Sequence, residues 1–397
     1  MADRVPRVTN DARQPRLADV IAVLEGMYDP AWARDWDSVG LVVGDPEAPI
    51  RRVLLAVDPA PAVVEEAVAW RADLVLTHHP LLFRAVNSAA ATTPKGRVIH
   101  QLVRAGCALY TAHTNADAAA PGVSDALARV LGLTDLVPLA PDPADPMDKI
   151  VTFAPEDATD VVIDAMASAG AGERGNDRRC AWTTPGAGTL VRPVDRDGLE
   201  HLEQETRKEQ RIEMVLPRHR RAEVLTALRA VHPDSRPVID VLELAEWPGP
   251  RGIGRVGRLG STTSLREFAM LVAEALPATV GGVRVAGDPG APVSRVAVCG
   301  GAGDSLLDQA RASGADVYVT SDLRHHPALD ARDAAGEAPP YLVDVAHWAG
   351  EWPWLAGVSN RLAGALEAQG TPVEVQVSAK CTDPWTFRVP SPGGVVR

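Results

Sequence analysis

Two adjacent histidines end an apolar run in the segment LVLTHHPLLF, residues 74–83. The run is typical of a buried strand, and Pro80 forces the residue before it into an extended conformation. Adjacent side chains of an extended segment point apart, so His78 and His79 would chelate a single ion poorly. The pattern fits two histidines that each bind a different ion of a close pair, and its simpler alternative is two surface histidines at a strand end.

Two further histidines each precede a carboxylate by four residues, His113 before Asp117 and His347 before Glu351. Residues four apart on a helix face the same side, so the imidazole and the carboxylate can converge on one point. These groups suit Zn, Mn, Fe, Co or Ni, and no thiolate is required. Together with other strand-end residues they predict a metal-binding cluster. Those other residues are His78, His79, Asp322, His325 and His326.

A duplicated pattern of elements positions these residues. Residues 51–80 and 294–327 both follow the order strand, turn, helix, strand, and Asp73 and Asp316 occupy equivalent places before the second strand. The repeat predicts an α/β fold with an internally duplicated three-layer core and mostly parallel sheets. The carboxyl ends of parallel strands share one edge, where open α/β sheets bind ligands.

A segment of different character separates the two halves. It predicts the order β-α-β-β followed by β-α-β, which indicates a ferredoxin-like α+β insert domain of roughly 100 residues. Proline-rich stretches mark its two boundaries, and it has no His/Asp cluster with ligand spacing. We therefore expect core half 1 at 1–140, the insert at 148–246 and core half 2 at 252–397.

Composition limits the classes of function. The formal net charge of -12 weighs against a broad surface that binds nucleic acid, because such surfaces replace phosphate counterions with many Lys and Arg. The four cysteines are scattered without a CxxC pair, and the polar start MADRVPRVTN is unlike a secretory signal. No stretch reaches the roughly 18 apolar residues of a membrane-spanning helix. We expect a cytoplasmic protein with free thiols and no membrane partner.

Several motifs, in order along the chain, resemble one family. They cover the chain from about Leu17 to Pro384, and the resemblance is to the GTP cyclohydrolase 1 type 2 homologue family, the NIF-three-like dinuclear metal-binding proteins. The insert resembles the PII-like or CutA-like domain of the long members. The motifs are WDSVGLVVGDP, THHPLLF, YTAHTNADAAAPGVSDALARVLGL, GGAGDS, TSDLRHH and the late HWAGE.

The resemblance implies two divalent metal ions per chain, with Glu351 bridging them. The implied metal ligands are His78, His79, Asp117, His347 and Glu351. Three other residues would lie behind these ligands or face the substrate, where they would orient ligands or transfer protons. These three are His113, Asp322 and His326. The resemblance also implies a toroidal homohexamer.

The chain departs from the family pattern at two places. Gly350 stands where the family usually has a threonine before the late glutamate, and Thr320-Ser321-Asp322 stands where the family often has TGE or TGD. Both departures concern hydrogen bonds around the centre rather than the metal ligands. The GGAGDS turn fits either an anion-binding turn at a helix start or an ordinary tight turn.

Two close metal ions can activate a water molecule and polarise the group that it attacks, so hydrolysis is the expected reaction class. The family name implies GTP or a related small molecule as substrate, although the sequence has no GxxxxGK[ST] phosphate loop that would select a nucleotide. The alternative is a non-catalytic, metal-dependent regulatory protein in which the insert binds a partner.

Overall fold

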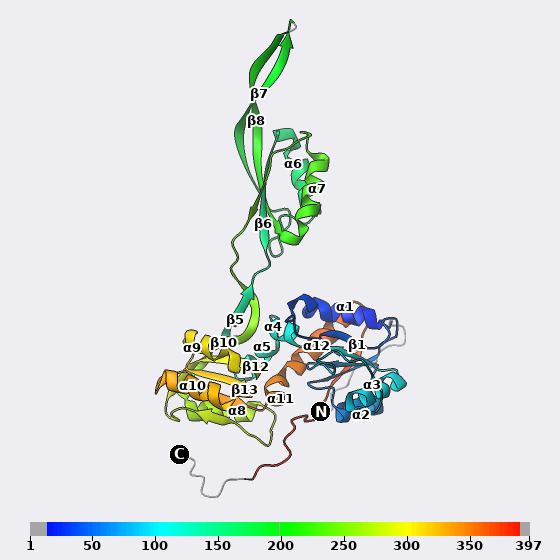
Figure 1. The fold of residues 1–397 in the computed structure, drawn as a ribbon, viewed down its shortest axis with the longest axis vertical. Coiled ribbons are helices and arrows are strands. Elements are labelled where there is room, and N and C mark those ends of the chain that lie inside the picture. Colours follow the sequence, from blue (N-terminus) through cyan, green and yellow to red (C-terminus); the bar gives the residue numbers. More distant parts are fainter. Residues whose placement is uncertain (1–13, 198, 390–397) are drawn as a thin grey trace, which may run out of the picture. The chain divides into compact units, whose positions relative to one another are not determined.

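The chain forms two compact units in the computed structural model (Figure 1). Residues Met1–Asp142 and Pro250–Arg397 make the first unit, and Pro143–Gly249 makes the second. The two predicted core halves therefore belong to one unit, and the predicted insert at 148–246 lies inside the other. The structure describes residues 14–197 and 199–389.

The first half of the core is built on a five-stranded sheet of order β1-β4-β3-β2-β15. Its last strand, β15, follows the second half of the core in the sequence, so the first sheet contains strands from both halves. The helices are α1 (Leu17–Met27), α2 (Pro61–Trp70), α3 (Pro94–Ala105), α4 (Thr114–Ala118) and α5 (Val123–Val130). The strands are β1 (Gly40–Val43), β2 (Arg52–Ala56), β3 (Leu74–Thr77), β4 (Ala108–Thr111) and β15 (Glu374–Val377).

The second half is built on a six-stranded sheet of order β11-β14-β13-β12-β10-β5. Its strands are β5 (Thr134–Pro143), β10 (Pro248–Ser264), β11 (Arg284–Ala286), β12 (Pro292–Ala302), β13 (Val317–Ser321) and β14 (Tyr341–Val345). Its helices are α8 (Leu265–Ala275), α9 (Leu307–Ala312), α10 (His325–Ala335), α11 (His347–Glu351) and α12 (Pro353–Ala368).

The first sheet is mostly parallel, as expected, since β15 also pairs in parallel with β2 and β1-β4 is the one antiparallel pair among its described strands. The second sheet is mixed, which corrects the expectation there. The central pairs β2-β3, β3-β4, β12-β13 and β13-β14 are parallel, as the strand-helix-strand pattern predicts. Antiparallel strands flank them: β1 pairs with β4, β11 with β14, and β10 with β12. The repeat governs only the centre of each sheet, because the flanking strands come from outside the repeated segments.

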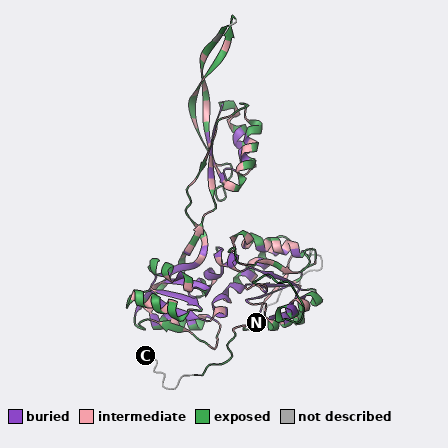
Figure 2. Cartoon of the chain, viewed as in Figure 1, coloured by how far each residue is buried: buried purple, intermediate pink, exposed green. Residues whose placement is uncertain are grey.

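Each sheet is covered by helices on both faces, so its central strands are buried on both sides. Alternation along β2 shows this: Val53 and Leu55 join a core that both sheets share, whereas Leu54 packs with α2 and α3 on the other face. The shared core also takes residues from α1, α5, α8 and α12. Figure 2 shows buried residues gathered in the strands and central helices of this unit.

The predicted duplication extends to individual hydrogen bonds. Oδ2 of Asp73 accepts the backbone N–H groups of Arg51 and Arg52, at 2.7 and 2.9 Å. Oδ2 of Asp316 accepts those of Ser294 and Arg295, both at 2.8 Å. Each aspartate thus fixes the start of one strand against the next. We call this set of hydrogen bonds, which is present in both halves, the shared frame.

The second unit has a ferredoxin-like order, β-α-β-β-α-β, with one strand fewer than the sequence predicts because Ala181–Arg196 forms a single strand. Its antiparallel four-stranded sheet has the order β7-β8-β6-β9, with its own hydrophobic core against two helices. The PII-like or CutA-like assignment stays a prediction. The elements are β6 (Met147–Ala154), α6 (Thr159–Ser168), β7 (Ala181–Arg196), β8 (Leu199–Pro217), α7 (Arg221–Val231) and β9 (Ile239–Glu243).

The cysteines are free thiols, as expected from their spacing: Cys107 and Cys299 are buried, and Cys381 is exposed. Within the described residues, no helix is both long enough and apolar enough to cross a membrane.

Candidate metal centre

The predicted site residues lie where parallel strands end. His78 and His79 directly follow β3, His113 follows β4 after one residue, and His347 follows β14 after one residue. Because β3 and β4 run in register in one sheet and β14 belongs to the other, the two strand edges meet at this place. The duplicated fold therefore brings together histidines that are far apart in the sequence.

Glu351 lies at the middle of the cluster. Its Oε1 is 3.4 Å from Nε2 of His78 and 2.9 Å from Nε2 of His347, and its Oε2 is 3.1 Å from Nε2 of His79. The two adjacent histidines thus face different oxygens of one carboxylate. This geometry is compatible with one ion on each side of Glu351.

The short helix α11 holds Glu351 in place. His347 begins this helix and Glu351 ends it, so the spacing of four residues puts both side chains on one face, as the sequence predicts. Burial raises the pKa of Glu351, but His79, His78 and His347 outweigh it and hold the pKa well below the usual range. Glu351 is therefore a carboxylate at neutral pH, although only 2% of it is exposed.

Several buried polar atoms at the centre have no hydrogen-bond partner, namely Nε2 of His78, Oδ1 of Asp117 and Oε2 of Glu351. A buried, unsatisfied polar atom costs about 1–3 kcal/mol, so three of them at one point indicate a missing partner. Imidazole nitrogens and carboxylate oxygens are donors for borderline or hard divalent ions. The residues present therefore fit metal ions.

Three of the histidines are hydrogen-bonded through Nδ1 to a carboxylate. Nδ1 of His79 donates to Asp58 at 2.7 Å, and Nδ1 of His347 donates to Asp322 at 2.6 Å. His113 donates in the same way to Asp37, at 2.8 Å. A partner on Nδ1 fixes the ring and leaves Nε2 free for a metal, which is the usual arrangement around metal-binding histidines. Nδ1 of the fourth histidine, His78, bonds the carbonyl of Ala112 at 2.9 Å.

Sequence analysis did not single out Asp37 and Asp58. Asp58 lies two residues after β2, so the rule that ligands follow parallel strands was a signal that could have found it. Asp37 belongs to the WDSVGLVVGDP motif, and its Oδ2 also accepts the backbone N–H of Thr114 at 3.0 Å. Its partners lie more than 70 residues away, so no local spacing marks it.

Protons compete for the centre when no metal is bound. Burial lowers the pKa of His79, but the Glu351 carboxylate and the bond to Asp58 raise it to about 11. Burial likewise lowers the pKa of His347, and Glu351 and Asp322 raise it to about 10. Each imidazole is therefore protonated between Glu351 and its second carboxylate in the metal-free protein, and metal binding must displace a proton from each.

His113 lies within the cluster. Its ring centroid is 5.1 Å from that of His78 and 5.5 Å from that of His79, and the three rings could hold a metal ion together. Asp117 lies on α4, with its Oδ1 3.7 Å from Nε2 of His78.

The structure does not bring His326 to the centre. This residue lies exposed in the first turn of α10, where its ring contacts only that of His325 among the described aromatic rings. It does not line the cavity at the site, so its predicted role in proton transfer gains no support. Asp322 lies behind His347, which agrees with the predicted orienting role.

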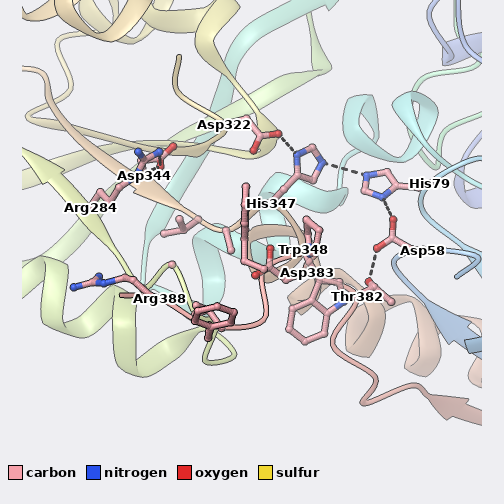
Figure 3. A pocket seen from close by; sticks show the side chains of 18 of the residues that line it. Asp58, His79, Arg284, Asp322, Asp344, His347, Trp348, Thr382, Asp383 and Arg388 are labelled. Atoms are coloured by element: carbon pink, nitrogen blue, oxygen red, sulfur yellow. Dashed lines mark hydrogen bonds and ion pairs between the residues drawn. The ribbon is translucent and has the colours of Figure 1, made fainter. Parts of the chain in front are cut away.

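A cavity of about 1100 Å³ opens beside the centre, between the ends of the strands and the C-terminal segment (Figure 3). His79, His113 and His347 line one side of it. Trp385 and Phe387 line another side, together with other residues of the segment 382–389. The cavity therefore gives a small molecule access to the histidines.

The GGAGDS turn packs against the centre. Gly301 has a φ of 73°, and a Cβ at this position would lie 2.4 Å from Oε1 of Glu351 and 3.2 Å from Nε2 of His347. Only glycine permits this close approach and this backbone conformation. The turn thus closes one side of the centre, which is a third use beside the two that its sequence suggested.

The chain is similar to a family and to named proteins over nearly its whole length. Residues 15–384 match the family described as Duf34/NIF3 (NGG1p interacting factor 3). A Mycobacterium bovis protein named GTP cyclohydrolase 1 type 2 homolog is 47% identical over 378 residues, which are 94% of this chain and 97% of that protein. A Streptomyces coelicolor protein of the same name is 37% identical over 377 residues, 95% of this chain and 96% of that protein.

The chain also matches solved structures. The crystal structure of a Bacillus cereus protein related to NIF3 matches with a TM-score of 0.77 and 34% identity, covering 95% of this chain and 100% of that chain. A Staphylococcus aureus protein matches with a TM-score of 0.81 and 27% identity, also covering 95% of this chain and 100% of that chain. Both matches span the core halves and the insert together.

Proposed function

This chain belongs to the Duf34/NIF3 family, and on that premise we propose that it binds two divalent metal ions and hydrolyses a small molecule beside them. The observation that carries the proposal is the position of Glu351, whose two oxygens face two adjacent histidines. Buried atoms without partners on His78, Asp117 and Glu351 support it further.

The residues divide into two sides around Glu351. His78 and Asp117 would hold one ion, and His79 and His347 would hold the other. Bound ions would supply Lewis acidity toward water and substrate. The chain's own groups orient the ligands, since Asp58 and Asp322 fix the rings of His79 and His347. Burial of Glu351 and His78 excludes bulk water from the inner face of the centre.

His113 is the chain's best group for moving a proton. Its Nδ1 donates to Asp37, which leaves Nε2 as an acceptor that faces the cluster and borders the cavity. An imidazole in this position can exchange a proton with a leaving group. Asp37 keeps the ring in the orientation that this role requires.

The proposed substrate is a nucleotide or a related small molecule. Relatives named GTP cyclohydrolase 1 type 2 homolog support a nucleotide or a related small molecule. The cavity volume of about 1100 Å³ lies slightly above the usual range for small-molecule sites and would accept a ligand of that size. A toroidal homohexamer is the proposed assembly, which light scattering of the purified protein tests directly.

Metal analysis followed by a substrate screen tests the function. Protein purified without a His tag is expected to hold two divalent ions per chain and to turn over a nucleotide or related compound. The variant H79A/E351A is expected to lose both metal and turnover while its circular dichroism stays native. Wild-type protein that takes up no Zn, Mn or Fe after loading would overturn the proposal.

The separate core of the insert unit favours one second candidate, a metal-dependent regulatory protein. In that case the insert would bind a partner, and the metal centre would hold a ligand without turnover. A metal-dependent interaction that maps to residues 148–246, with no turnover on any tested compound, would select this alternative.

A further inference from the structure

We propose that Thr382, in the segment that follows the last strand, is a positioning residue of the metal centre that acts through Asp58 on His79. The inference rests on the proposed metal centre and adds to it a residue outside the predicted ligand set. It also assigns a role to the C-terminal segment, which lines the cavity opposite the histidines.

The contacts form a continuous chain, drawn in Figure 3. The hydroxyl of Thr382 donates to Oδ2 of Asp58, and Nδ1 of His79 donates to Oδ1 of the same carboxylate at 2.7 Å. A carboxylate held at one oxygen can still turn about its last side-chain bond. Contacts at both oxygens fix its plane, and the fixed carboxylate in turn fixes the imidazole ring whose Nε2 faces Glu351.

The hydrogen bonds of Asp58 agree with this role. Its two oxygens accept from two donors, Nδ1 of His79 and the hydroxyl of Thr382. Hydrogen bonds to a carboxylate are stronger than those between neutral groups.

Hydrogen bonds of an earlier residue, Ser378, fix the position of Thr382. Four residues earlier, the backbone N–H of Ser378 donates to the carbonyl of Leu55 at 2.8 Å, and its hydroxyl donates to Glu66 at 2.6 Å. The indole of Trp352, one residue after Glu351, donates to the carbonyl of Ser378 at 3.2 Å. The segment is therefore anchored to β2, to α2 and to the end of α11 before it reaches Asp58.

Beyond Thr382 the chain becomes a wall of the cavity. Trp385 and Phe387 are 71% and 77% exposed, and neither has an aromatic partner among the described residues. Thr382 therefore lies between the part of this segment that is anchored to the core and the part that lines the cavity.

The other side of the centre offers an internal contrast. Asp322 supports His347 at 2.6 Å, but 59% of its side chain is exposed, compared with 30% for Asp58. No hydroxyl donates to Asp322 among the hydrogen bonds of the described residues. Among the described residues, contacts that run from a hydroxyl through a carboxylate to a histidine of the centre are therefore found at His79 and not at His347.

Three single variants of the full-length protein test the inference: T382V, T382S and the control T371V. T382V removes the hydroxyl at nearly constant volume, whereas T382S keeps it. Thr371 donates to the carbonyl of Leu366 at 3.2 Å in the turn after α12, so T371V makes the same chemical change away from the centre. The probe is Co²⁺, measured by chelator competition and by its visible absorption, with the melting temperature of each metal-free variant recorded.

We expect T382V to weaken binding of one of the two Co²⁺ ions by about tenfold, the low end of losses for groups behind a ligand. Its absorption band should shift, and T382S should restore both quantities while T371V leaves them unchanged. A T382V protein with wild-type affinity and spectrum would overturn the positioning role and leave the metal centre intact. Wild-type protein that binds no Co²⁺ would overturn the proposed function itself.

Discussion

In the first half of the core, Asp73 precedes β3 and Thr77 ends it; in the second half, Asp316 precedes β13 and Thr320 lies near its end. The two residues after the threonine differ, His78-His79 in the first half and Ser321-Asp322 in the second. Only the first half therefore presents two imidazoles at this strand end.

The second half contributes to the same centre by other means. Asp322 stands where His79 stands in the repeat, and instead of facing the centre it supports His347 from behind. Ser321 stands at the place of His78, and its buried hydroxyl has no hydrogen-bond partner. The two halves share one backbone pattern but differ in chemistry, since the second half supplies Glu351 and the first half supplies the paired histidines.

Loss of the Glu351 carboxylate should have the largest effect. Glu351→Gln keeps the shape but removes the charge that faces three histidines, so we expect both ions to be lost, beyond the about 100-fold weakening typical when groups behind ligands are removed. Elemental analysis after loading measures this. Glu367→Gln, an exposed change on α12, is the control. Retention of one ion in Glu351→Gln would show that the two sides are independent.

The carboxylates behind the two histidines should differ in importance. Asp58→Asn is expected to weaken metal binding by about 10- to 100-fold, because Asp58 is the less exposed and doubly held partner. Asp322→Asn should have a smaller effect, since its side chain is 59% exposed. Asn tolerates the positive φ of 54° at residue 322, so backbone strain does not confound the comparison. Equal losses in chelator competition would contradict the asymmetry.

The metal-free protein should lose stability as pH rises. The pKa of His79 is raised to about 11 and that of His347 to about 10, both above the unfolded value of about 6.5. Their stabilisation is therefore complete below about pH 6.5 and is lost as pH rises through 10 to 11. We expect the melting temperature to fall between pH 7 and pH 10 without metal.

Metal-loaded protein supplies the control for this pH dependence. Bound ions require deprotonated imidazoles, so rising pH strengthens their binding and should offset the fall. The double variant H79A/H347A should show a flatter metal-free profile than the wild type. A metal-free melting temperature that stays constant or rises over this range would show that protonated histidines do not stabilise the centre.

The sequence predicts the elements that carry the candidate ligands because strand ends and helical spacing are local patterns. The family resemblance is confirmed by the match over residues 15–384. The partners Asp37 and Asp58 were missed because their contacts join distant segments. His326 was grouped with the cluster because it follows a strand, but a helix that begins at His325 places it on the surface. The antiparallel pairs β1-β4, β11-β14 and β10-β12 were missed because β1, β10 and β11 lie outside the repeat.

The smallest effects should come from the shared frame, where the two halves are predicted to be equivalent. Asp73→Ala and Asp316→Ala each leave two backbone N–H groups without an acceptor, so each should lower the free energy of unfolding by about 1–3 kcal/mol. Asp308→Ala, at an exposed ion pair on α9, should change it by about 0.5 kcal/mol or less. Denaturant titration of metal-free protein measures all three. Equal losses at Asp73 and Asp316 would mean that asymmetry arose only at the strand ends, whereas a loss confined to one half would mean that the frame has diverged as well.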